Sequence, residues 1–97
     1  MLNLASIKKK KDMLAEKQRS IYRKIYHNIV SLINHNAGNN IDFCLFQVPY
    51  FMLDEVTYPL NECLQYLDEK LKDIKKDDNI IEITFYQPNV YYIKWKI

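Results

Sequence analysis

Glycine is almost absent from this chain, with Gly38 alone among 97 residues. A glycine-rich phosphate loop, a dinucleotide fingerprint and a nucleophile elbow each need several residues without a Cβ where backbone meets ligand. The sequence therefore lacks the features of those sites. It also has no recognisable pattern of nucleophile, base and oxyanion-stabilising group. We expect a protein that is not an enzyme, with no catalytic residues and no cofactor.

Cysteine and histidine are equally scarce. Two cysteines, Cys44 and Cys63, and two histidines, His27 and His35, are all that the chain contains. A Cys2His2 metal site needs a close cysteine pair and a close histidine pair, and neither spacing occurs. Both cysteines lie in apolar patterns, and we expect no secretory signal. We therefore expect two reduced, buried thiols rather than a disulfide, and no metal site.

Long apolar runs are missing as well. The first residues lead directly into Lys8 without the apolar core or cleavage site of a signal peptide. No window approaches the roughly 18 consecutive apolar residues of a membrane span. Hydrophobic residues nevertheless make up 48% of the chain, which is too many for intrinsic disorder. A length of 97 residues allows one small folded domain.

Charge is distributed unevenly along the chain, whose formal net charge is +2. Residues 1–30 hold eight basic and two acidic residues, a balance of +6, so the remaining residues carry −4. The basic residues, which we call the basic patch, are Lys8, Lys9, Lys10, Lys11, Lys17, Arg19, Arg23 and Lys24. This split predicts a basic element for an acidic partner, attached to a slightly acidic body.

The N-terminal third of the chain predicts one long helix. Nothing breaks a helix from Ala5 to about His35, and from Leu14 onwards apolar residues recur with helical spacing. Gly38 and the two asparagines after it favour a left-handed helix stop. Because the sequence before Leu14 is polar, we expect residues 1–13 to be a basic extension of the helix that projects from a single α+β domain of residues 14–97.

The remainder predicts a strand, a second helix and a hairpin. Residues 42–48 are apolar on both alternating faces, which is typical of a strand covered on both sides. Asn61 is the expected N-cap of a helix with a one-sided apolar stripe, and residues 75–79 are the expected turn after it. Residues 81–86 and 91–97 alternate like the strands of a hairpin. The order α-β-α-β-β predicts a three-stranded mixed sheet, with the last strand between two parallel strands.

The loop between the first strand and the second helix is unusually rich in large apolar groups. Pro49 ends the strand, and we expect the loop to contact a partner because exposed apolar patches of this kind mark interaction sites. The expected partner-binding residues are Tyr50, Phe51, Met52, Leu53 and Tyr58.

Three stretches together resemble a small family encoded by nucleocytoplasmic large DNA viruses, the giant viruses. They are Phe46-Gln47-Val48-Pro49, Tyr58-Pro59-Leu60-Asn61-Glu62-Cys63-Leu64 and Tyr86-Gln87-Pro88-Asn89-Val90. These motifs define a fold and contain no catalytic signature. The resemblance implies a component of the virus particle, such as a minor capsid protein, located in the virion and in the host cytoplasm during assembly.

Two functional hypotheses follow. In the first, the N-terminal helix and the apolar loop dock onto larger virion or capsid proteins. In the alternative, the basic patch neutralises phosphates of nucleic acid without reading sequence, since no groove-reading module is recognisable. The sequence leaves self-association open. The basic segment would look the same against an acidic protein, packaged DNA or acidic lipid.

Overall fold

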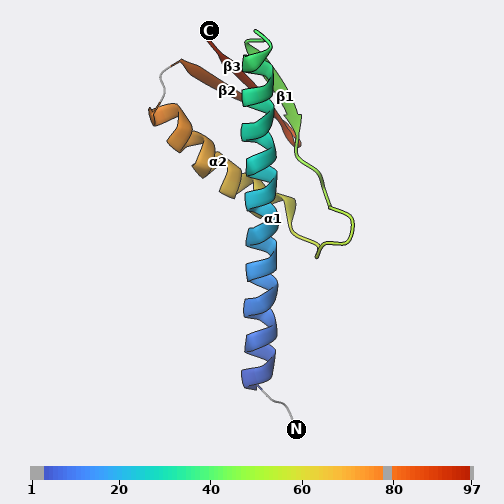
Figure 1. The fold of residues 1–97 in the computed structure, drawn as a ribbon. Helices are drawn as coiled ribbons and strands as arrows, with labels where there is room; N and C mark the ends of the chain where they lie inside the picture. Colours follow the sequence, from blue (N-terminus) through green and yellow to red (C-terminus); the bar gives the residue numbers. More distant parts are fainter. Residues whose placement is uncertain (1–3, 78–79, 97) are drawn as a thin grey trace.

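The computed structural model of the chain describes residues 4–77 and 80–96. Its elements are α1 (Leu4–Gly38), β1 (Phe43–Gln47), α2 (Leu60–Asp77), β2 (Ile81–Tyr86) and β3 (Val90–Trp95), as Figure 1 shows. The predicted order α-β-α-β-β and the α+β class are confirmed. The chain forms one small domain, and residues 1–3 of the predicted basic extension lie outside the described residues.

The sheet has the strand order β1-β3-β2. The last strand lies between the other two, and β1 and β2 run in the same direction, as predicted. The prediction of a mixed sheet was wrong in one respect. Both hydrogen-bonded pairs, β1 with β3 and β2 with β3, are antiparallel. Since β3 separates the two strands that run in the same direction, no parallel pair forms.

Helix α1 packs on the sheet and on α2 through its C-terminal half only. Ile21, Ile25 and Ile29 are at most 1% exposed, and their spacing of four residues places them on one face of the helix. The helix has 35 residues and is therefore about 52 Å long. The body is much smaller, since the molecule measures 62 × 27 × 24 Å. The N-terminal half of α1 consequently extends well beyond the body (Figure 1).

Helix α2 places its apolar stripe in the core. Cys63 and Leu67 are fully buried, and Leu71 is 2% exposed. The helix begins at Leu60, two residues earlier than an Asn61 cap implies, because the Pro59 carbonyl already accepts a hydrogen bond from the Cys63 amide. It also continues to Asp77, through part of the predicted turn. The other turn residues, 78–79, lie outside the described residues.

Two of the sequence motifs meet in the body and have a structural role. The Val48 amide donates to the Asn89 carbonyl at 2.8 Å, and Asn89 Nδ2 donates back to the Val48 carbonyl at 2.6 Å. Asn89 is 2% exposed, so its amide is satisfied inside the core. These bonds join the end of β1 to the β2–β3 turn. The motifs therefore stabilise the fold.

The prediction that β1 is covered on both faces was wrong. Cys44 is buried and Phe46 half-buried, but Phe43 and Leu45 are 43% and 58% exposed. Both helices lie against the face that carries Cys44, and within the described residues no element covers the other face. Strand β1 thus carries more apolar side chains than the fold of one chain buries.

Candidate interaction surfaces

The first candidate surface is the projecting arm, which we define as residues 5–17 of α1. Almost every side chain on it is exposed. The apolar residues Ile7, Met13 and Leu14 are 40–51% exposed. Ile7 and Leu14 are fourteen and seven residues before Ile21, so they continue the buried face of α1 out past the body. An exposed apolar stripe therefore runs along the arm.

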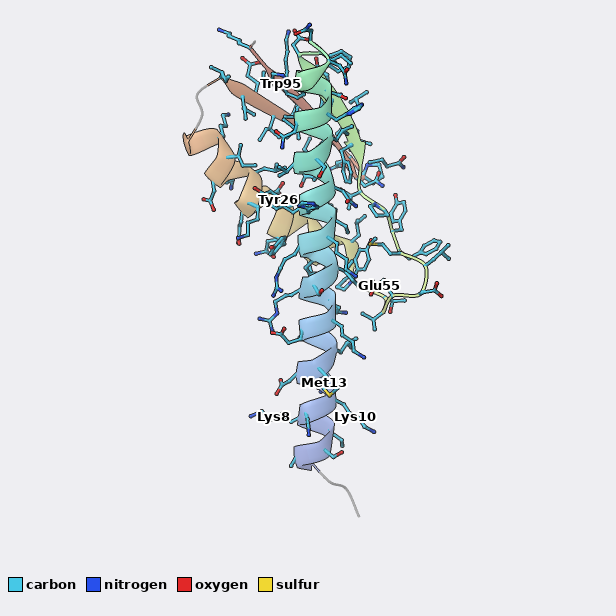
Figure 2. The ribbon with its side chains drawn as sticks, viewed as in Figure 1. Lys8, Lys10, Met13, Tyr26, Glu55 and Trp95 are labelled. Carbon is cyan, nitrogen blue, oxygen red and sulfur yellow. The ribbon has the colours of Figure 1, made fainter. Side chains whose placement is uncertain are left out.

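The four consecutive lysines of the arm do not form one basic face. Successive residues of an α-helix are rotated by about 100°, so Lys8 to Lys11 point in all directions around the helix. Figure 2 shows Lys8 and Lys10 on opposite sides of α1. Among the described residues, none of these four lysines forms an ion pair within 4.0 Å, and neither does Lys17. The arm is thus a positively charged rod.

The rest of the basic patch lies closer to the body and is partly neutralised. Arg19 is 3.8 Å from the Glu16 carboxylate on the exposed side of α1. Lys24 Nζ lies 2.6 Å from Glu55 Oε1 in the loop after β1. Arg23 is exposed. The structure thus divides the patch into an unpaired outer part on the arm and an inner part in which Arg19 and Lys24 contact neighbouring carboxylates.

The second candidate surface is the loop of residues 50–58, which lies beside α1 where the arm leaves the body (Figure 1). Gln18 Nε2 donates to the Thr57 carbonyl at 3.0 Å, and Glu55 pairs with Lys24. The Tyr22 and Tyr58 rings meet edge to face with centroids 5.7 Å apart. The loop and α1 are therefore held together by polar and aromatic contacts.

The five loop residues predicted to bind a partner do not share one environment. Tyr50, Phe51 and Leu53 are 54%, 64% and 84% exposed, whereas Met52 is half-buried against the core. Tyr58 is 7% exposed and donates to the Pro49 carbonyl, so it is a core residue and not part of a docking surface. The loop surface that remains consists of Tyr50, Phe51 and Leu53.

The core beneath the loop holds titratable groups in their neutral forms. Burial, and secondarily the nearby Glu62 carboxylate, raises the pKa of Tyr22 to about 12. Burial raises the pKa of the Cys63 thiol to about 11 and also raises that of Cys44. A cysteine is reactive or metal-binding when its thiolate is accessible. Both thiols are buried and unbridged, as the sequence predicts, and they have the features of structural residues.

Among the residues that the structure describes, no group of three or more histidine, cysteine, aspartate or glutamate side chains is placed to hold a metal ion. His27 and His35 are exposed on α1. His35 accepts a hydrogen bond at its carbonyl from Asn39 Nδ2. No described helix is both long and apolar enough to cross a membrane.

A small cavity of about 310 Å³ lies between α2 and β2. Its floor includes Leu71, Phe85 and Tyr91, and its rim includes Lys72. Asp68 accepts a hydrogen bond from Tyr91 Oη at 2.6 Å, and burial, followed by this bond, raises the Tyr91 pKa. Asp68 is the carboxylate that lines the cavity, and its hydrogen bond holds the core residue Tyr91 in place.

Fold and surfaces together define a small α+β protein whose distinctive chemistry lies on a basic arm and an exposed aromatic loop. The chain belongs to a family of unknown function, DUF5759, whose model matches residues 2–72. It is similar to "Uncharacterized protein R447" of Acanthamoeba polyphaga mimivirus, with 32% identity over 99 residues that cover 99% of this chain and 77% of the relative. No solved structure matches it. The predicted resemblance to a giant-virus family is confirmed.

Proposed function

We propose that this chain is a non-enzymatic interaction protein of a giant virus, a minor capsid component that bridges larger virion proteins through the arm and the loop. One observation carries the proposal: the arm extends beyond the body with its apolar stripe and its lysines uncovered. A helix that projects in this way has no packing role in its own fold, so an apolar stripe on it is best explained by a partner. The relationship to a mimivirus protein supports the viral setting.

The side chains of the arm indicate which groups the partner's binding surface must present. Ile7 and Leu14 need an apolar groove, and the lysine between them on the same face, Lys11, needs a carboxylate beside that groove. Phe51 and Leu53 of the loop lie where the arm joins the body and would extend the same contact. The expected partner is therefore a protein with an apolar groove and an acidic rim, in a shell built from many copies of a major coat protein.

Quantitative mass spectrometry of purified particles, separated into shell and core fractions, tests the proposed location. We expect the protein in the shell fraction at a fixed ratio to the major coat protein. Recovery with the genome in the core would support the second candidate below. Absence from particles would overturn the virion assignment.

Substitutions in the loop test the contact itself. Phe51→Ser and Leu53→Ser change exposed side chains, so both variants should fold as the wild type does and yet fail to enter particles. Ile41→Ser, at an exposed apolar residue between α1 and β1, is the control and should be incorporated normally. Circular dichroism and thermal unfolding check the fold. Normal incorporation of both loop variants would remove the loop from the proposal.

Sequence-independent binding of nucleic acid is the second candidate, and the unpaired lysines around the arm favour it. Each phosphate neutralised adds about 0.9 to the slope of log affinity against log salt for duplex DNA. Because Lys8 to Lys11 surround the helix, about half of them face one duplex at a time. Replacing all four by Gln should lower the slope by about 2. The control replaces four lysines of the body, Lys70, Lys72, Lys94 and Lys96, and an equal change there would mean diffuse attraction only.

A further inference from the structure

The sheet has an open outer face, opposite the helices. Side chains alternate along a strand. Because Cys44 and Phe46 of β1 point inward, Phe43, Leu45 and Gln47 point outward. The register aligns three rows across the sheet on this face. The rows are Phe43, Lys94 and Glu82; then Leu45, Tyr92 and Thr84; then Gln47, Val90 and Tyr86.

Part of this outer face is more apolar than a sheet surface that faces water. Antiparallel sheets with one wet face normally alternate between apolar inward and polar outward residues. Strand β2 follows this rule with Glu82 and Thr84. Strand β1 breaks it with Phe43 and Leu45, and the Phe43 ring lies 6.0 Å from the ring of Tyr92 on β3. An apolar area therefore covers β1 and β3 and leaves β2 as a more polar border.

The charge of the outer face argues against a polyanion as its occupant. The nine positions include one cation, Lys94, and one anion, Glu82, which are direct neighbours in the β2–β3 register. Their charges cancel, so the face neither attracts nucleic acid nor repels another copy of itself. The strongly basic residues lie on the arm instead.

The three rows also make the face complementary to itself. A two-fold axis along the strands would place Lys94 on Lys94 of the other copy. With a two-fold axis across the strands, the middle row lies on the middle row, so that Leu45 meets Leu45 and Tyr92 meets Tyr92. The charged row then lies over the row of Gln47, Val90 and Tyr86, so Glu82 meets the Tyr86 phenol, and Lys94 lies over Val90 between the Gln47 amide and that phenol.

We propose that this outer face pairs with the same face of a second copy of the chain, with Leu45 and Tyr92 at the centre. The dimer covers the apolar side of β1 that a single chain leaves exposed. The dimer also carries two arms, so each dimer can hold two partners at once. The inference rests on the sheet and is independent of the proposed function of the arm.

The size of the face sets how strong this pairing is. Three strands at about 4.8 Å spacing and five residues at about 3.4 Å give a patch of roughly 14 × 17 Å. Stable complexes usually bury about 800 Å² per partner, whereas a flat patch of this size covers roughly 240 Å² and lies below that range. We therefore expect a dimer that forms at high protein concentration and dissociates on dilution.

Sedimentation equilibrium of the full chain over a wide concentration range tests the proposal. The wild type should rise from 11.7 kDa towards twice that mass. Leu45→Lys and Tyr92→Lys should stay monomeric over the same range, because each places a cation against its own copy across the axis. Phe51→Lys, which changes an exposed aromatic residue in the loop, is the control and should associate like the wild type. Circular dichroism confirms that each variant is folded.

Three results would overturn the proposal. The first is a wild type that remains monomeric at the highest concentration reached. The second is a dimer that survives Tyr92→Lys and is lost with Gln47→Pro, since the Gln47 amide points to the free edge of β1 and this result would mean edge-to-edge strand pairing. The third is a monomer that binds a labelled single-stranded oligonucleotide and loses it on Tyr92→Lys, which would assign the face to base stacking.

Discussion

The two halves of α1 have the same backbone conformation and opposite surroundings. In the C-terminal half, Ile21, Ile25 and Ile29 are fully buried against β1 and α2, whereas in the N-terminal half Ile7 and Leu14 stay exposed on the same helical face. An isolated helix as short as the arm is marginal in water, and most helical stability in proteins comes from tertiary packing. The comparison indicates that the body anchors the helix and that the arm is available for contacts with other molecules.

A matched pair of substitutions should show the largest difference between the halves. Ile25→Ala opens a cavity in the core and should cost about 2–5 kcal/mol of unfolding free energy. Leu14→Ala removes an exposed side chain from the same helical face, and its cost should stay within about 0.5 kcal/mol. Urea denaturation of both variants measures the difference. Equal costs would mean that the arm is packed in the folded protein.

Alkaline pH should weaken the body that anchors α1, through the buried Cys63 thiol of α2. Burial raises the pKa of Cys63 from 9.0 to about 11, so the folded state holds the proton more tightly than the unfolded state. The resulting stability is complete below pH 9 and is lost as the pH rises towards 11. Two pKa units correspond to about 2.7 kcal/mol at most.

The control for this pH dependence is Cys63→Ala, which has no thiol to titrate. Its unfolding free energy should start lower, because a buried side chain is shortened, and should fall less steeply between pH 9 and 11. An unchanged slope in the variant would assign the alkaline loss to other groups, among them Tyr22 with its pKa of about 12.

The junction between the two halves should have the smallest effect on stability. The Lys24–Glu55 ion pair is short, at 2.6 Å, but its side chains are 54% and 31% exposed. Exposed ion pairs of this kind contribute about 0–1 kcal/mol. Lys24→Gln should therefore change the unfolding free energy by less than about 1 kcal/mol, and added salt should reduce the difference. A larger cost would mean that the loop is needed to hold α1 on the body.

Much of the fold follows from periodicity in the sequence. The apolar spacing of α1 and α2 and the alternation in β2 and β3 predict the element order, and the antiparallel hairpin with a crossover predicts β3 in the middle of the sheet. The outer end of α1 is predicted to project because no apolar stripe dense enough for packing precedes Leu14. Local patterns of this kind predict the elements because the apolar residues of each helix or strand mark the face that it buries.

Exposure could not be predicted where local patterns are ambiguous. The apolar pattern of β1 indicates that both its faces are covered, but it does not say whether the cover belongs to the same chain. Tyr58 and Phe51 look alike in a loop sequence, and only the fold turns Tyr58 into the core to reach the Pro49 carbonyl. The circumferential arrangement of Lys8 to Lys11 follows from helix geometry once α1 is known to continue there.

Hydrogen exchange resolved along α1 in the full chain tests most directly whether the two halves differ as described. Amides of residues 21–33 should exchange slowly, with protection that approaches the global unfolding free energy. Protection should fall steeply before Gln18, because the arm opens without disturbing the core. Equally strong protection from residue 5 to residue 33 would contradict the account, since it would require the arm to be packed against the body.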